Sequence, residues 1–137
     1  MNALTSFKKK TLLVVEDDQH SRLLITHRLS KLDINVIEAG TGEEALEIVK
    51  DQKIEGMLLD IALGNGISGL DLGKKLKAEQ RFKNTPMVAI TAYEKSLLSE
   101  FDESGFTGYL QKPYSSSDLR NLLTEQALRK KGQRIIL

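Results

Sequence analysis

The stretch Leu12-Leu13-Val14-Val15-Glu16-Asp17-Asp18 joins a short apolar run directly to three acids. An apolar run without alternation, rich in β-branched residues, is typical of a strand that is buried on both faces, as in a parallel sheet. A second run, Met57-Leu58-Leu59, ends in the single acid Asp60. An acid in such a place either lies at the surface end of a strand or is costly to bury. Both stretches therefore predict strands with carboxylates at their carboxyl ends.

The unit of strand and helix recurs five times along the chain. Apolar runs predict strands at residues 12–15, 34–38, 54–60, 87–90 and 106–110. Apolar residues at helical spacing predict helices at residues 19–32, 42–51, 70–81, 95–103 and 115–130. Parallel strands need crossover connections, and right-handed crossovers place helices on both faces of the sheet. We expect one doubly wound α/β domain at residues 10–130, with residues 1–9 as a lead-in and residues 131–137 as a C-terminal tail.

The first helix carries its own start signal. Asp18 precedes it as a candidate N-cap, and apolar residues recur at helical spacing at Leu23, Leu24, Leu29 and Leu32. His20 and His27 lie seven residues apart on the same helix, with no partner at metal-ligand spacing. We therefore expect both histidines to face solvent or to pack at the margin of the helix.

Composition excludes several classes of function. The 137 residues include 20 Lys and Arg against 19 Asp and Glu, and this balance gives no overall attraction to nucleic acid or to an anionic membrane. The chain has no Cys, which removes disulfides, thiolate nucleophiles and zinc–thiolate sites and fits a reducing, cytoplasmic setting. No apolar stretch approaches the roughly 20 residues of a membrane span. We expect a soluble protein with neither nucleic acid nor membrane as a direct partner.

Polar residues follow four of the predicted strands. Glu16 and Asp17 follow the first, Asp60 ends the third, Thr91 follows the fourth and Lys112 follows the fifth. In an open α/β sheet the functional crevice lies beyond the carboxyl ends of the strands. Carboxylates gathered there repel one another unless a cation intervenes, and oxygen ligands suit Mg²⁺. With a lysine and a hydroxyl donor at the same edge, the crevice would favour a phosphoryl group bound to a carboxylate.

Four motifs at these strand ends resemble the receiver domain of bacterial two-component response regulators. They are Val14-Val15-Glu16-Asp17-Asp18, Leu58-Leu59-Asp60, Ile90-Thr91-Ala92 and Gly108-Tyr109-Leu110-Gln111-Lys112-Pro113. The resemblance extends over nearly the whole chain. It implies a flavodoxin-like (βα)5 fold with strand order 2-1-3-4-5, and transfer of a phosphoryl group from a histidine kinase to one aspartate.

The resemblance also implies a role for each matching residue. Asp60 would be the phosphoacceptor and Asp17 a direct Mg²⁺ ligand, with the backbone carbonyl of Ala62 as a further ligand and Glu16 acting through water. Thr91 and Lys112 would each contact a phosphoryl oxygen, the Lys112-Pro113 bond would be cis, and Tyr109 would be the aromatic that turns inward on activation. Implied partners are a sensor histidine kinase or phosphotransfer protein, a downstream target or fused domain, and a second copy of the chain.

The chain departs from the family pattern after Asp60. Gly64 stands where a proline is expected, Ser68 stands where a glycine is expected, and Gly69 follows one place later, so that the loop is one residue longer. The resemblance implies that Ala62 and Tyr93 flank the path of the water that would hydrolyse an acyl phosphate, and neither is a small polar group able to orient that water. We therefore expect slow autodephosphorylation.

The expected function is a phosphoacceptor switch, which catalyses its own Mg²⁺-dependent phosphorylation but is not a conventional enzyme. Three other functions are compared with it. A haloacid-dehalogenase-type phosphatase needs a second Asp two residues after the first, where this chain has Ala62. A flavodoxin needs hydroxyls and amides in its first loop, whereas Glu16-Asp17-Asp18 would repel phosphate. A degenerate receiver that only mediates protein contacts is the remaining alternative. The chain could be a single-domain regulator, the receiver of a hybrid kinase or part of a longer regulator.

Overall fold

The computed structural model describes residues 7–64, 66–94 and 105–130, in which five parallel strands form one sheet in the order β2-β1-β3-β4-β5. The strands are β1 (Thr11–Val15), β2 (Asn35–Ala39), β3 (Gly56–Asp60), β4 (Met87–Thr91) and β5 (Gly108–Gln111). The helices are α1 (Gln19–Ser30), α2 (Gly42–Ile48), α3 (Gly69–Lys77), the 3₁₀ helix Gln80–Phe82 and α4 (Ser116–Lys130). The predicted strand order is confirmed. The predicted helix at residues 95–103 lies outside the described residues, as do residues 1–6 of the lead-in and the tail.

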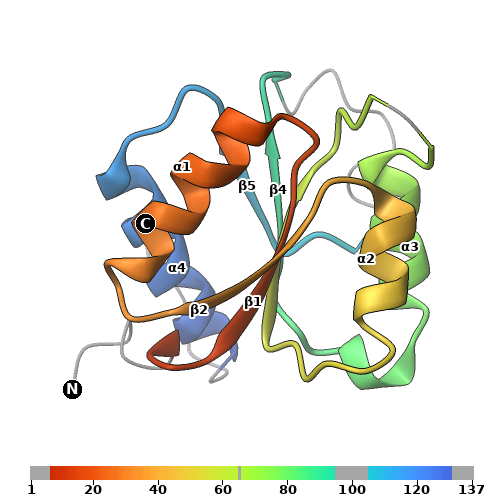
Figure 1. Ribbon diagram of the computed structural model, residues 1–137. Helices are drawn as coiled ribbons and strands as arrows, with labels where there is room; N and C mark the ends of the chain where they lie inside the picture. The colour runs from red at the N-terminus through yellow and green to blue at the C-terminus, as the bar shows by residue number, and fades with distance from the viewer. Residues whose placement is uncertain (1–6, 65, 95–104, 131–137) are drawn as a thin grey trace.

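Helices cover both faces of the sheet. Figure 1 shows α1 and α4 on one side and α2 and α3 on the other. Alternate residues of β1 serve the two layers: Leu12 and Val14 pack in the core under α1 and α4, while Leu13 and Val15 pack in the core under α2 and α3. Because successive side chains of a strand point to opposite faces, a strand covered on both sides must be apolar at every position. This explains the run without alternation.

The start and the capping of α1 follow the sequence prediction, but its buried face does not. Asp18 is the N-cap, and its carboxylate accepts from the Ser21 N–H at 2.8 Å. Ile25 and Leu29 are the buried residues of the helix, whereas Leu23 and Leu24 are 55% and 45% exposed. Only some of the apolar residues that predict the helix therefore lie on its buried face. Both histidines of the helix are exposed, as expected.

Most element boundaries differ from the predicted ones by one to three residues, and the largest difference lies at the end of α3. The helix predicted at residues 70–81 begins one residue earlier and ends at Lys77, and a short 3₁₀ helix follows it. The Lys77 ammonium, at the end of α3, donates to the carbonyls of Phe82 and Thr85 and so stabilises this break. In the described part of the chain no helix is both long enough and apolar enough to span a membrane.

Candidate functional site

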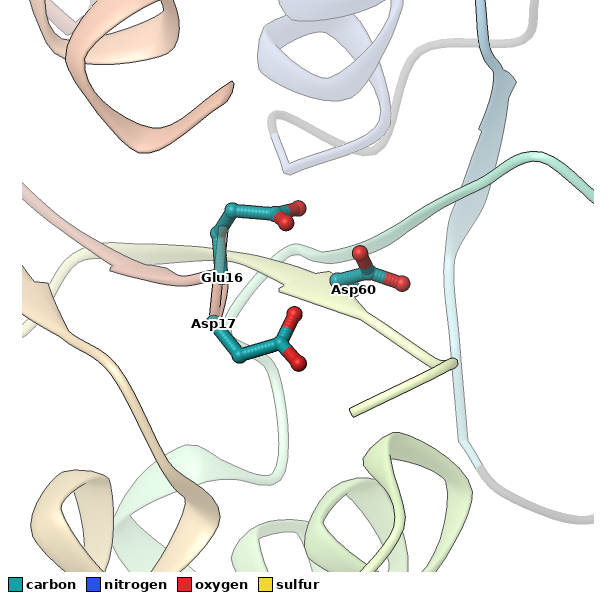
Figure 2. A group of neighbouring side chains, drawn as sticks. All are labelled: Glu16, Asp17 and Asp60. Atoms are coloured by element: carbon teal, nitrogen blue, oxygen red, sulfur yellow. The ribbon is translucent and has the colours of Figure 1, made fainter. Parts of the chain in front are cut away.

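Strand pairing brings the predicted acids together at one edge of the sheet. β1 and β3 are neighbours with Val15 opposite Leu59, so Glu16 and Asp17 leave β1 beside Asp60, the last residue of β3. One oxygen atom from each carboxylate can be chosen so that all three lie within 4.8 Å of one another. Figure 2 shows the three side chains directed toward a common space. Glu16 and Asp60 are 1% and 5% exposed, while Asp17 forms the solvent side of the group.

A backbone N–H group holds each of these carboxylates in place. Asp60 Oδ1 accepts from the Ala62 N–H at 2.8 Å, and Glu16 Oε1 accepts from the Asp18 N–H at 3.1 Å. Asp17 Oδ2 accepts from the Gly64 N–H at 2.9 Å. Charge-assisted hydrogen bonds of this kind compensate part of the desolvation of buried carboxylates.

Lys112 supplies the positive charge. Its Nζ lies 2.8 Å from Glu16 Oε2 and 3.0 Å from Asp60 Oδ2, in two ion pairs shielded from solvent. Burial and the neighbouring Asp60 raise the pKa of Glu16 to about 7, although Lys112 opposes this rise. Burial alone would lower the pKa of Lys112, but the hydrogen bonds and charges of Glu16 and Asp60 outweigh it, and the pKa is raised. Lys112 is therefore a fixed cation.

Thr91 and Tyr109 lie on the neighbouring strands. Thr91 is fully buried at the end of β4, and its hydroxyl oxygen accepts from the Tyr93 N–H at 3.3 Å. Tyr109 is half-buried on β5 and packs against the pair Ile61 and Ala89. The Lys112-Pro113 peptide bond is cis. The described contacts thus join Glu16, Asp60 and Lys112, and Asp17 lies close to them. Thr91 lies beside this group, and Tyr109 packs on the adjacent strand.

The donor set fits a hard divalent cation. Every candidate ligand is an oxygen, and the three carboxylates exceed the single positive charge of Lys112. Mg²⁺ prefers carboxylate and carbonyl oxygen, and a divalent cation would relieve the remaining repulsion. Glu16, Asp17 and Asp60 are therefore suitable candidate ligands.

Two contacts around the loop between β3 and α3 are not predicted by the sequence. Gly64 departs from the family pattern, and its N–H is also the hydrogen-bond donor to Asp17. Glu43 on α2 is the second case, since its two carboxylate oxygens lie 3.3 and 3.1 Å from the Ile67 nitrogen. Both donors are backbone groups, which no residue type marks in a sequence. The available signal in the sequence was the three glycines of the loop, Gly64, Gly66 and Gly69, because glycine lets other groups approach the backbone closely.

Comparisons with known proteins agree with this geometry. The chemotaxis protein CheY-3 of Vibrio cholerae is 30% identical over 118 residues, which cover 85% of this chain and 90% of that protein. The sensor histidine kinase CheAY of Helicobacter pylori is 32% identical over 114 residues, which cover 81% of this chain. The structure of the response regulator protein TrrA from Thermotoga maritima, in complex with Mg(2+)-BeF, is 27% identical with a TM-score of 0.75 and covers 85% of this chain and 98% of that one.

Some of these relatives are much longer than this chain, which spans 14% of the Helicobacter pylori kinase and 8% of histidine kinase P4 of Formosa agariphila. The model of the response regulator receiver domain matches residues 12–124, which include the five strands of the sheet except Thr11 and every residue of the acidic site. This chain therefore belongs to the response regulator receiver domain family.

Proposed function

We propose that this chain is a phosphoacceptor switch, which takes a phosphoryl group from the phosphohistidine of a histidine kinase or phosphotransfer protein onto Asp60. The position of Asp60 carries the proposal. Its carboxylate is nearly buried at the sheet edge, beside two further carboxylates, and is paired with Lys112 at 3.0 Å. A strand-end acid that merely capped a turn would need neither the acidic pair nor the lysine.

The roles of the individual residues follow from the chemistry of phosphoryl transfer. Asp17, Asp60 and the Ala62 carbonyl would hold Mg²⁺, with Glu16 acting through water, and the ion would neutralise charge on the transferring oxygens. An oxygen of Asp60 forms the new P–O bond as the P–N bond of the phosphohistidine breaks. The imidazole nitrogen keeps the electron pair of that bond and takes a proton from solvent. Lys112 then pairs with a phosphoryl oxygen.

Thr91 is suited to contact a second phosphoryl oxygen. Its hydroxyl oxygen accepts from the Tyr93 N–H, so its proton stays available for donation. We propose that this contact and a movement of Tyr109 change the surface formed by β5 and α4. That surface would bind a downstream target, a fused domain or a second copy of the chain. We further propose that the domain spans residues 10–130. We also propose that it works in the cytoplasm, a reducing compartment that suits a chain without Cys.

Acetyl phosphate is a small donor that tests the proposal without a kinase. After incubation with acetyl phosphate and Mg²⁺, intact-mass measurement should show the gain of one phosphate. The gain should disappear in Asp60→Asn and in the presence of a chelator. If the wild-type chain gains nothing, the degenerate receiver that only binds other proteins is favoured instead. A gain that persists in Asp60→Asn would place the acceptor on another residue.

The phosphorylated state should decay slowly, and two substitutions should accelerate its decay. Ala62 and Tyr93 are both exposed beside the site, and neither is a small polar side chain suited to orient an attacking water. We expect Ala62→Asn and Tyr93→Glu each to speed dephosphorylation about tenfold, the worth of one well-placed hydrogen bond in the transition state. A time course of the phosphorylated mass measures this, with Tyr93→Phe as the matched control that adds no polar group for water. Equal decay in all four proteins would contradict the hypothesis.

A further inference from the structure

The loop between β3 and α3 contacts the acidic group through its own backbone. The Gly64 N–H donates to Asp17 Oδ2 at 2.9 Å. A Cβ atom at residue 64 would lie 2.8 Å from the same oxygen, closer than real contacts of this kind allow. The contact therefore needs both an N–H group and the absence of a side chain, and only glycine meets the two conditions.

A second carboxylate anchors the same loop from outside the site. Glu43, in the first turn of α2, accepts from the Ile67 N–H with both of its oxygens. Gly66 lies between the two anchored residues with a φ of 75°, and a Cβ atom there would overlap with the Glu43 carboxylate. The left-handed backbone of Gly66 and its missing side chain thus let Glu43 reach the loop.

The hydrogen bond from Gly64 acts directly on Asp17, the exposed member of the acidic group, whereas Glu43 acts on it only through the loop. A free carboxylate on the surface samples several rotamers, and ordering it on metal binding costs conformational entropy. The hydrogen bond from Gly64 removes part of that freedom beforehand. Figure 2 shows the Asp17 side chain with one oxygen turned toward the other two carboxylates.

We propose that Gly64 and Glu43 are positioning residues for metal binding: the Gly64 N–H orients Asp17, and Glu43 holds the loop that carries this N–H. The inference rests on the proposed function, since it presumes that the acidic group binds Mg²⁺. The lengthened, glycine-rich loop is then part of the metal site. One residue that affects metal affinity, Glu43, then lies on α2.

Mg²⁺ titrations of the full chain, followed by ¹⁵N chemical shifts, test the proposal. Gly64→Ala should keep the fold, because the inserted Cβ meets only the end of the Asp17 side chain, but it should displace that carboxylate and weaken Mg²⁺ binding about tenfold. Glu43→Ala should weaken binding about threefold, because it loosens the loop without touching the acids. Glu47→Ala is the matched control: it removes an exposed glutamate of the same helix, one that pairs with Lys50, and should leave the affinity unchanged.

Two further readouts separate positioning from a general loss of structure. In metal-free protein the Gly64 amide proton should resonate downfield and should move upfield in Asp17→Asn. With acetyl phosphate as the donor, Glu43→Ala should need more Mg²⁺ for half-maximal phosphorylation but should reach the wild-type rate at saturation.

The failure of this inference is distinguishable from the failure of the proposed function. If the wild-type chain binds no Mg²⁺, both are wrong. If the wild-type chain binds Mg²⁺ and incorporates phosphate, but Gly64→Ala and Glu43→Ala bind Mg²⁺ as tightly, only the inference is wrong. It is also wrong if Glu47→Ala weakens binding as much as Glu43→Ala does.

Discussion

Replacing Lys112 with alanine should lower the free energy of unfolding by about 2 kcal/mol in Mg²⁺-free buffer and should prevent measurable phosphate incorporation. Lys112 pairs with Glu16 and Asp60, whose side chains are only 2% and 6% exposed. Removing one partner of a buried ion pair typically costs about 3–5 kcal/mol. We expect less here because the lysine is 23% exposed and because Glu16, with a pKa of about 7, can take up a proton. Urea denaturation followed by circular dichroism measures the change.

Mg²⁺ distinguishes lost charge from lost packing in this variant. Because a divalent cation can replace the missing positive charge, Mg²⁺ should stabilise Lys112→Ala more than it stabilises the wild-type chain. The exposed lysine Lys83 provides a control, since Lys83→Ala should change neither stability nor phosphorylation appreciably. Our assignment of Lys112 would be wrong if Lys112→Ala were as stable as the wild-type chain and accepted phosphate at the same rate.

Gly69→Ala should be the most damaging of the glycine substitutions near the site, with a loss of about 3 kcal/mol. A Cβ atom at Gly69 would overlap with the carbonyl oxygen of Asp60 and the Cα of Ile61. Both are backbone atoms at the end of a buried strand, so neither can move aside without displacing the phosphoacceptor. Phosphorylation should therefore fall together with stability, as measured by denaturation and by acetyl phosphate labelling.

Gly64→Ala is the natural comparison for Gly69→Ala, because its Cβ meets a flexible side chain instead of the backbone. We expect it to change the free energy of unfolding by less than about 1 kcal/mol while it weakens Mg²⁺ binding. Similar stability losses in both variants would show that the loop responds as a whole, and that the close approach at Gly69 has no special importance.

The sequence was sufficient to predict that distant polar residues meet. Lys112 and Glu16 are 96 positions apart, yet both follow strands of a parallel sheet, and the carboxyl ends of such strands lie at one edge. Helix caps could also be predicted from the sequence, because they depend on local residue types. Asp18 caps α1, as its place directly before the apolar spacing of that helix predicts.

Other features depend on information that residue types do not carry. Leu23 and Leu24 are as apolar as Leu29, and only the orientation of α1 on the sheet decides which of them is covered. The loop contacts of Asp17 and Glu43 involve backbone N–H groups 47 and 24 positions away. Every residue except proline has such a group, so a sequence cannot show which one is used. The extra loop residue was visible in the sequence, but its anchors were not.

The two-sided burial of β1 has a consequence for how that strand finds its register. A one-residue slip moves every side chain of a strand to the opposite face, and such a slip is usually prevented because one face rejects polar groups. Leu12, Leu13, Val14 and Val15 are all apolar and serve both layers, so their pattern alone opposes a slip only weakly. The acids oppose the slip more strongly. A slip by one residue would move the exposed Asp17 into the buried position of Glu16 and break its hydrogen bond with the Gly64 N–H. The acids that would bind the metal in the proposed switch therefore also fix the register of β1 and the position of its carboxyl end.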